Sequence, residues 1–427
     1  MSQRKKRPSQ QHLDKIQKAQ HRNEFIGKLK YLCDNLSGDK KLFTLIPSVE
    51  LEKMYDLRSH AIRIIPEQEG DVEDDLLKAI KKLLPGILKI TKVPVTEKGD
   101  LQISLSDFYT VAQTLFGYLE VIKDDSYPAA SKVRQSLDSF YKFYSLNLPA
   151  WQALNNAAFF FILGFCEFSH KIYWHEVRAT CDLYKGAPMG FCLRILTHVP
   201  EKIHVNLDGN SRPAFAVGWG VYPNKFEHVH IKAADLGIES SFSTIPMPVY
   251  IQSHAQQRLA ERLDCLEQGY VEFFVYNSLK NLKYFKDKNG NPLIEYNYFG
   301  FKTGYLRADI HHGKIIIRTF LFLTNNGTPE GEKLNEFTGL SKLDHKYLNI
   351  DKLSTFMSAD IRNNIEVKDI FVRAGCKSLF DIDANFIFDT KHGTNPVAAM
   401  NLSKYIKMPE TESSLNAMSG IPINPQL

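Results

Sequence analysis

The stretch YIQSHAQQRLAERLDC, Tyr250–Cys265, joins a β-like segment to a charged helix. At about 100° per residue along a helix, one polar stripe collects four side chains: His254, Arg258, Glu261 and Arg262. The neighbouring stripe is apolar. Ser253 is predicted to be the N-cap, with Gln256 three residues later as in a capping box. Taken alone, the stripe is also typical of a solvated surface helix in which Glu261 pairs with Arg258.

The segments after this helix predict a small α+β module over residues 249–345. A second helix is expected over 267–283, followed by strands in PLIEYNYFGF and in GYLRADIHHGKIIIRTFLFLTN. His312-Gly313 lies between two strand-like runs, as in a hairpin turn. A further helix is expected from about Pro329. The predicted order of elements in this module is therefore strand, helix, helix, strands and helix, and the first strand and helix belong to the stretch Tyr250–Cys265.

The whole chain of 427 residues is predicted to be α+β, with four regions. These are a mainly helical region with a basic, disordered N-terminus (1–148), an antiparallel β-rich region (149–248), the module (249–345), and a mixed C-terminal region with a loose tail (346–427). Pro85 and Gly86 are expected to interrupt or end a helix that begins at Glu73. The apolar run FFFILGFCEF, 159–168, is interpreted as a strand, and DGNSRP, 208–213, as a turn. The β-rich region either forms its own domain or extends the sheet that follows.

Composition restricts the function classes only moderately. A net charge of +5 and a pI near 8.6 permit an acidic partner without requiring one. The six cysteines include no CxxC pair, which favours scattered reduced thiols in the cytoplasm. The longest apolar run is too short to span a membrane, and no secretory signal is predicted. Motifs for P-loop, Rossmann and GxSxG chemistry are absent from the sequence.

Four segments carry a resemblance to a known family: SHAQQRLAERL, EYNYFGF, YLRADIHHGKIIIRTFLFL and TPEGEKL. Residues 250–340 resemble the small RelE/BrnT-type ribonuclease-toxin domains, especially relatives that open with an H-A-x-x-R-x-x-x-R helix. The resemblance covers under a quarter of the chain. It implies a toxin or bacterial defence-type protein that cleaves RNA without a metal or cofactor. In that reaction a ribose 2′-OH attacks the adjacent phosphate.

Such a reaction needs a proton acceptor, a proton donor and cations that stabilise the phosphorane. His254 suits proton transfer because an ordinary imidazole titrates near neutral pH, and arginine forks match phosphate oxygens. Glu261 would act as a base or orient an arginine. Arg307, Asp309 and His311 share one face of their predicted strand. The predicted catalytic set is His254, Arg258, Glu261, Arg262, Arg307 and Arg318.

RNA binding is predicted to involve a second set of side chains: Arg4, Lys5, Lys6, Arg7, Tyr298 and His311. The basic tail would contact phosphates, and the tyrosine ring would stack a base. Ordinary roles remain open for each, namely a solvated tail, core packing and a surface turn. The expected partner is RNA, with a protein partner or residues 1–248 as a possible restraint.

Two other hypotheses compete with the ribonuclease prediction. The same fold would serve a non-catalytic subunit that binds nucleic acid or protein. The weaker alternative is a metalloenzyme built on His204, His228 and His230. No metal is predicted, because no carboxylate or cysteine completes that set.

Overall fold

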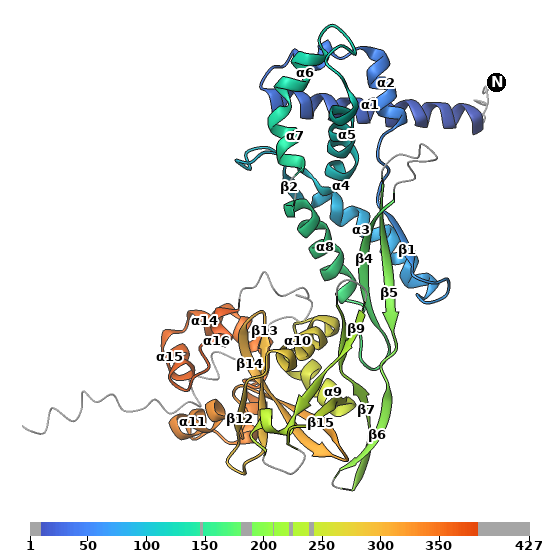
Figure 1. Cartoon of the computed structure of the whole chain (residues 1–427). Helices are drawn as coiled ribbons and strands as arrows, with labels where there is room; N and C mark the ends of the chain where they lie inside the picture. Colours follow the sequence, from blue (N-terminus) through green and yellow to red (C-terminus); the bar gives the residue numbers. More distant parts are fainter. Residues whose placement is uncertain are drawn as a thin grey trace, which may run out of the picture. The chain divides into compact units, whose positions relative to one another are not determined.

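The computed structural model describes residues 10–145, 148–180, 190–207, 209–221, 225–238 and 243–382. The chain divides into two compact units that interleave along the sequence. The first comprises residues 1–162, 173–197 and 222–224, and the second comprises 163–172, 198–221 and 225–427. The predicted α+β class is confirmed (Figure 1). Among the described helices, none combines the length and apolar character needed to cross a membrane.

The first unit is mainly helical, as predicted for the N-terminal region. Its helical segments are α1 (Gln10–Ser37), η1 (Leu42–Leu45), α2 (Ser48–Asp56), α3 (Asp74–Ile90), α4 (Leu105–Asp107), η2 (Phe108–Ala112), α5 (Gln113–Val121), α6 (Ala130–Ser136), α7 (Asp138–Ser145) and α8 (Leu148–Leu163). Its strands are β1 (Arg63–Pro66), β2 (Lys92–Pro94), β3 (Gln102–Ser104), β4 (Ile172–Thr180) and β5 (Gly190–His198). β1 pairs with β5 in parallel within a three-stranded sheet of order β1-β5-β4, and β2 pairs with β3.

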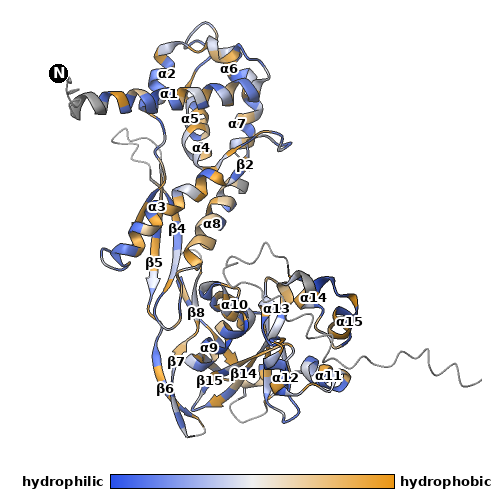
Figure 2. Ribbon diagram, turned by 180° about the vertical axis from the view of Figure 1, so that it is seen from behind, coloured by the Kyte–Doolittle hydropathy of each residue, from blue (hydrophilic) through white to orange (hydrophobic). Residues whose placement is uncertain are grey.

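Two local predictions in the first unit are wrong. Pro85 lies inside α3, which continues to Ile90. An internal proline costs a helix about 3 kcal/mol, and the burial of Ile80, Leu84 and Leu88 along one face offsets that cost. The first half of the apolar run 159–168, interpreted as a strand, belongs to α8, whose apolar colouring is evident in Figure 2. Such a run lacks the periodicity that separates a buried strand from a buried helix.

The second unit is built on an eight-stranded sheet. Its strands are β6 (Lys202–Leu207), β7 (Asn210–Ala216), β10 (His230–Lys232), β11 (Pro246–Gln252), β12 (Tyr284–Lys286), β13 (Pro292–Tyr298), β14 (Phe301–His311) and β15 (Lys314–Phe322). The order is β12-β13-β14-β15-β11-β7-β6, with β10 also paired to β11. β11 runs parallel to β15, and the other pairs in this sheet are antiparallel.

The predicted β-rich region thus contributes to more than one sheet. β6, β7 and β10 extend the sheet of the module, whereas β4 and β5 belong to the first unit. β8 (Gly218–Val221) and β9 (Lys225–His228) form a separate two-stranded ribbon. The module itself follows the predicted order of elements from β11 onward.

The helices of the second unit are α9 (Ser253–Arg262), α10 (Gln268–Lys280), α11 (Pro329–Thr338), α12 (Lys342–Tyr347), α13 (Leu353–Met357), α14 (Ala359–Asn363), α15 (Ile365–Arg373) and α16 (Ser378–Asp381), with the short η4 (Ala233–Leu236). α9 packs on β15 and α10 packs on β13. Ala255 and Leu259 of α9 are fully buried, so the apolar stripe of the opening stretch faces the core. The polar stripe of α9 therefore lies away from the core, where its side chains bond to other polar groups or to solvent.

Candidate functional site

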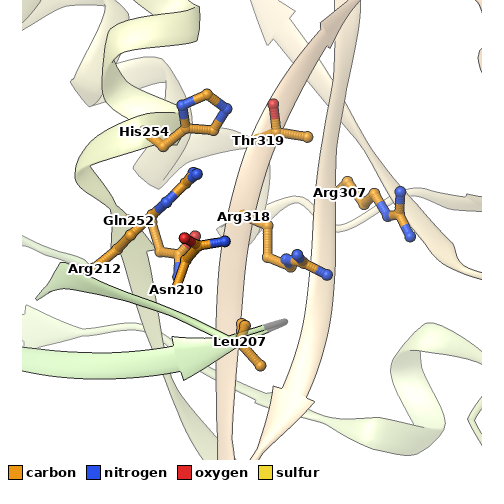
Figure 3. A pocket seen from close by; sticks show the side chains of 8 residues that line it. All are labelled: Leu207, Asn210, Arg212, Gln252, His254, Arg307, Arg318 and Thr319. Atoms are coloured by element: carbon orange, nitrogen blue, oxygen red, sulfur yellow. The ribbon is translucent and has the colours of Figure 1, made fainter.

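A pocket of ≈ 280 Å³ opens in the second unit where several elements meet. Its lining residues are Leu207, Asn210, Arg212, Gln252, His254, Arg307, Arg318 and Thr319 (Figure 3). They come from the β6–β7 hairpin, the end of β11, the start of α9, and the paired strands β14 and β15. One pocket is therefore lined by three of the predicted catalytic residues, His254, Arg307 and Arg318. His254 is more than 50 positions from the two arginines in the sequence.

The junction between β11 and α9 places Gln252 and His254 at the pocket. β11 is a central strand, held between β15 and β7, so the position of its last residue is well defined. α9 begins at Ser253, with Gln252 rather than Ser253 in the N-cap position. The Gln256 amide donates to the buried carboxylate of Glu272 at 2.9 Å and does not complete a capping box. The predicted Ser253 cap is therefore wrong by one residue.

A β-bulge explains how Arg318 and its neighbour Thr319 both line the pocket. Arg307 pairs with Thr319, but Ala308 pairs with Ile317, so Arg318 is the extra residue on β15. In a regular strand, consecutive side chains point to opposite faces, whereas a bulge re-aims a side chain and is common near functional sites. Arg318 then donates to Asp309 at 2.7 Å, with about a quarter of each side chain exposed.

Arg212 is a pocket residue that sequence reasoning missed. The segment DGNSRP was interpreted as a turn, but Asn210 already pairs with Leu207, and Arg212 lies on β7 opposite Val205. The guanidinium extends toward the His254 ring (Figure 3). The position of Arg212, two residues after the turn pair Leu207–Asn210 and within a strand, was the sequence feature that could have predicted its place in the pocket. The strong turn composition concealed it.

The pocket is electropositive. Partial burial lowers the pKa of His254, and the nearby Arg212 and Arg258 lower it further. Glu261 opposes them with a smaller effect, and Arg318 contributes the smallest lowering. Within the described residues, neither Arg212 nor Arg307 forms an ion pair, and the buried Nε of Arg307 has no hydrogen-bond partner there. The Arg307 guanidinium lies farther from the imidazole than that of Arg212 (Figure 3). A neutral imidazole beside unneutralised arginines is suited to an anionic ligand.

The other members of the predicted stripe are directed elsewhere. Arg258 bonds to Glu261 at 2.6 Å, and both side chains are about 40% exposed. Arg262 forms an ion pair with Asp351, in which both side chains are largely buried. None of these three predicted catalytic residues lines the pocket. The helix wheel placed them on one stripe correctly but did not show which neighbouring segment each would meet.

The predicted RNA-contacting residues have different positions. Arg4, Lys5, Lys6 and Arg7 lie outside the described residues. Tyr298 is fully buried, with ring centroids 4.8 Å from Phe274 and 5.0 Å from Phe299. This packing leaves its ring no exposed face for stacking a base. His311 lies at the β14–β15 turn, with its ring centroid 4.1 Å from that of His312.

The histidines considered for a metal do not assemble into a centre. His204 lies on β6, His228 ends β9 and His230 begins β10. His228 instead contacts the rings of His198 and Phe226. Across the part of the chain that the structure describes, no group of three or more His, Cys, Asp or Glu side chains is arranged to hold a metal ion.

Comparison with known proteins adds no homologue to this geometry. No family model, curated protein or solved structure matches the chain.

Proposed function

We propose that the second unit is a metal-independent endoribonuclease of a toxin or defence-type protein, with its active site in the pocket around His254. The observation that supports this proposal is the convergence of one imidazole and three guanidinium groups from four separate parts of the fold. The pocket also lies at the start of α9, where the helix dipole favours an anion. These features match the needs of a phosphodiester better than those of a neutral ligand.

The proposed chemistry assigns a role to each of these groups. Because its pKa is lowered, His254 is mostly neutral near pH 7 and able to accept the proton of a ribose 2′-OH. Arg212 and Arg318 would stabilise the charge that develops on the phosphorane. Arg307, farther from the ring, would contact a neighbouring phosphate. The products would be a 2′,3′-cyclic phosphate and a 5′-OH, and the departing oxygen would take its proton from solvent.

One observation favours a second function, RNA binding without cleavage. Of the eight residues that line the pocket, His254 alone has a side chain whose ordinary pKa is near neutral. Attack and departure occur on opposite sides of phosphorus, so a single imidazole does not serve both steps at once. A site with a single imidazole is sufficient to bind RNA. For cleavage it would supply only one of the two proton transfers.

Incubation of labelled RNA in EDTA tests the proposal. Wild-type protein should yield 2′,3′-cyclic phosphate ends, and His254→Ala should lower the rate by about 10²–10⁴-fold, the usual contribution of a general base. His230→Ala is the matched control, because His230 is exposed and lines no part of the pocket. Thermal unfolding of each variant verifies that the fold is retained.

The outcomes separate the two functions. Binding of RNA by the wild type without any cleavage would support the recognition function and exclude the nuclease. A wild type that neither binds nor cleaves RNA would exclude both.

The proposal includes the cytoplasm as the place of action, where thiols stay reduced. The cysteines described by the structure, Cys33, Cys166, Cys192, Cys265 and Cys376, are buried. A nuclease of this type also requires restraint in the cell that makes it, which residues 1–248 or a partner protein would supply.

A further inference from the structure

The side chain of Gln252 is the least expected polar group in the pocket. Only 2% of this residue is exposed, yet it lines the pocket. Its backbone pairs with Ala214 of β7, which holds it at the end of β11. Within the described residues, its amide has no hydrogen-bond partner. Among the described residues, the amide atoms of Gln252 do not belong to the fully buried side-chain atoms that lack a partner. The amide is therefore accessible from the pocket that it lines, where a ligand can donate to it and accept from it.

The chemistry of an amide indicates what that ligand presents. An amide offers a donor and an acceptor side by side, whereas a phosphate oxygen only accepts. The arginines of the pocket already suit phosphate. The edge of a nucleobase carries adjacent donors and acceptors, and glutamine pairs with adenine through two such bonds. Half-buried Leu207 adds an apolar contact for a base, and Asn210 adds a second amide at the same wall.

We propose that Gln252 is a specificity-determining residue that reads the edge of one nucleobase of bound RNA, with adenine preferred. This inference rests on the proposed function, because it takes the ligand to be RNA. The pocket volume of ≈ 280 Å³ lies near the lower end of ordinary ligand sites, which fits one nucleotide rather than several. Bases in single-stranded RNA expose the edge that such an amide requires.

Binding of single nucleotides tests the inference without requiring catalysis. AMP, GMP, CMP, UMP and ribose 5-phosphate are titrated into the full-length protein by calorimetry. AMP should bind the wild type about tenfold more tightly than ribose 5-phosphate, in the range of one bidentate base contact. Gln252→Leu should remove the preference for AMP and leave the affinity for ribose 5-phosphate within about twofold, since the arginines hold the phosphate.

Gln257→Leu is the matched control, because Gln257 is an exposed glutamine on α9, the helix that follows Gln252, and its amide bonds to Glu261. It should keep the preference for AMP. Thermal unfolding gives a second measurement: Gln252→Leu should melt no lower than the wild type in the absence of ligand, because no hydrogen bond is lost. A clear fall in melting temperature would indicate a structural role and overturn the proposal.

The remaining outcomes distinguish this inference from the proposed function. Equal binding of all four nucleotides and ribose 5-phosphate would overturn the role of Gln252, whether or not the wild type cleaves RNA. Selective AMP binding that survives in Gln252→Leu would also overturn it. RNA that is bound but not cleaved, with a preference for adenine that depends on Gln252, would support this inference while the nuclease proposal fails.

Discussion

At the scale of single residues, the pKa of His254 depends on side chains that are distant from it in the sequence. Arg212 lies on β7, and Arg318 is brought to the pocket by a bulge in β15. Both are cations near a partly buried imidazole, and both lower its pKa. The protonation state of His254 therefore depends on residues of the sheet as well as on its own helix.

Replacing Arg212 should change that protonation state. Arg212→Ala removes a positive charge beside His254, so the pKa of the imidazole should rise toward the ordinary value of 6.5. Since His254 is proposed to act as a base, the acidic limb of the cleavage profile should move to higher pH. Titration of the His254 ring by NMR measures the shift directly. Arg373→Ala is the control, because Arg373 is a half-exposed arginine on α15. An unchanged pKa in Arg212→Ala would contradict the assignment.

At the scale of elements, the two ends of α9 make different contacts. Its first turn reaches the pocket through His254, whereas its last turn is joined to the segment before α13 by Arg262 and Asp351. Arg258 and Glu261 lie between these ends and form an exposed pair. The single polar stripe of the helix wheel is thus divided among a pocket, a surface and a largely buried contact.

The two arginine pairs of α9 should differ sharply in stability. Arg262→Ala leaves Asp351 as a largely buried carboxylate without its cation, and should lower the free energy of unfolding by about 3–5 kcal/mol. Arg258→Ala removes an exposed pair and should cost about 1 kcal/mol or less. Urea denaturation of both variants measures the difference. Equal losses in the two variants would show that the contact with Asp351 does not anchor α9.

At the scale of the whole molecule, Glu272 connects segments that are distant in the sequence. Its carboxylate accepts hydrogen bonds from Gln256 and Gln268, each at 2.9 Å, and from the backbone N–H of Phe168. The residue is fully buried, and burial raises the pKa of Glu272 to about 7, although the three donors act in the opposite direction. The contact joins α9, α10 and the segment 163–172 within the second unit.

This buried carboxyl should make the stability of the protein depend on pH. Between its ordinary pKa of 4.5 and its raised pKa of about 7, the folded state binds more protons than the unfolded state. The contribution of Glu272 to the free energy of unfolding is therefore fully present below pH 4.5. It falls by up to about 1.4 kcal/mol per pH unit as the pH rises toward 7. Glu272→Gln should abolish this slope in urea denaturation between pH 5 and 8. Glu366→Gln, at an exposed position of α15, should keep it; persistence of the slope in Glu272→Gln would assign it to other groups.

The sequence by itself determined the α+β class, the order of elements from β11 to α11 and the split of α9 into apolar and polar stripes. These features depend on local periodicity and turn composition, which a single chain displays directly. The same local reasoning failed for Pro85 and for the apolar run in α8, because burial rather than propensity decides such segments. It also assigned the whole polar stripe to one site.

Only the tertiary structure decided which polar groups meet. Sheet pairing brought β7 beside β11, and the bulge at Arg318 turned that side chain toward the pocket. Neither event leaves a clear mark in the local sequence, because strand partners are chosen by contacts between distant segments. The pocket accordingly gained Arg212 and Gln252, while Arg262 was directed to Asp351 and Tyr298 was buried in the core.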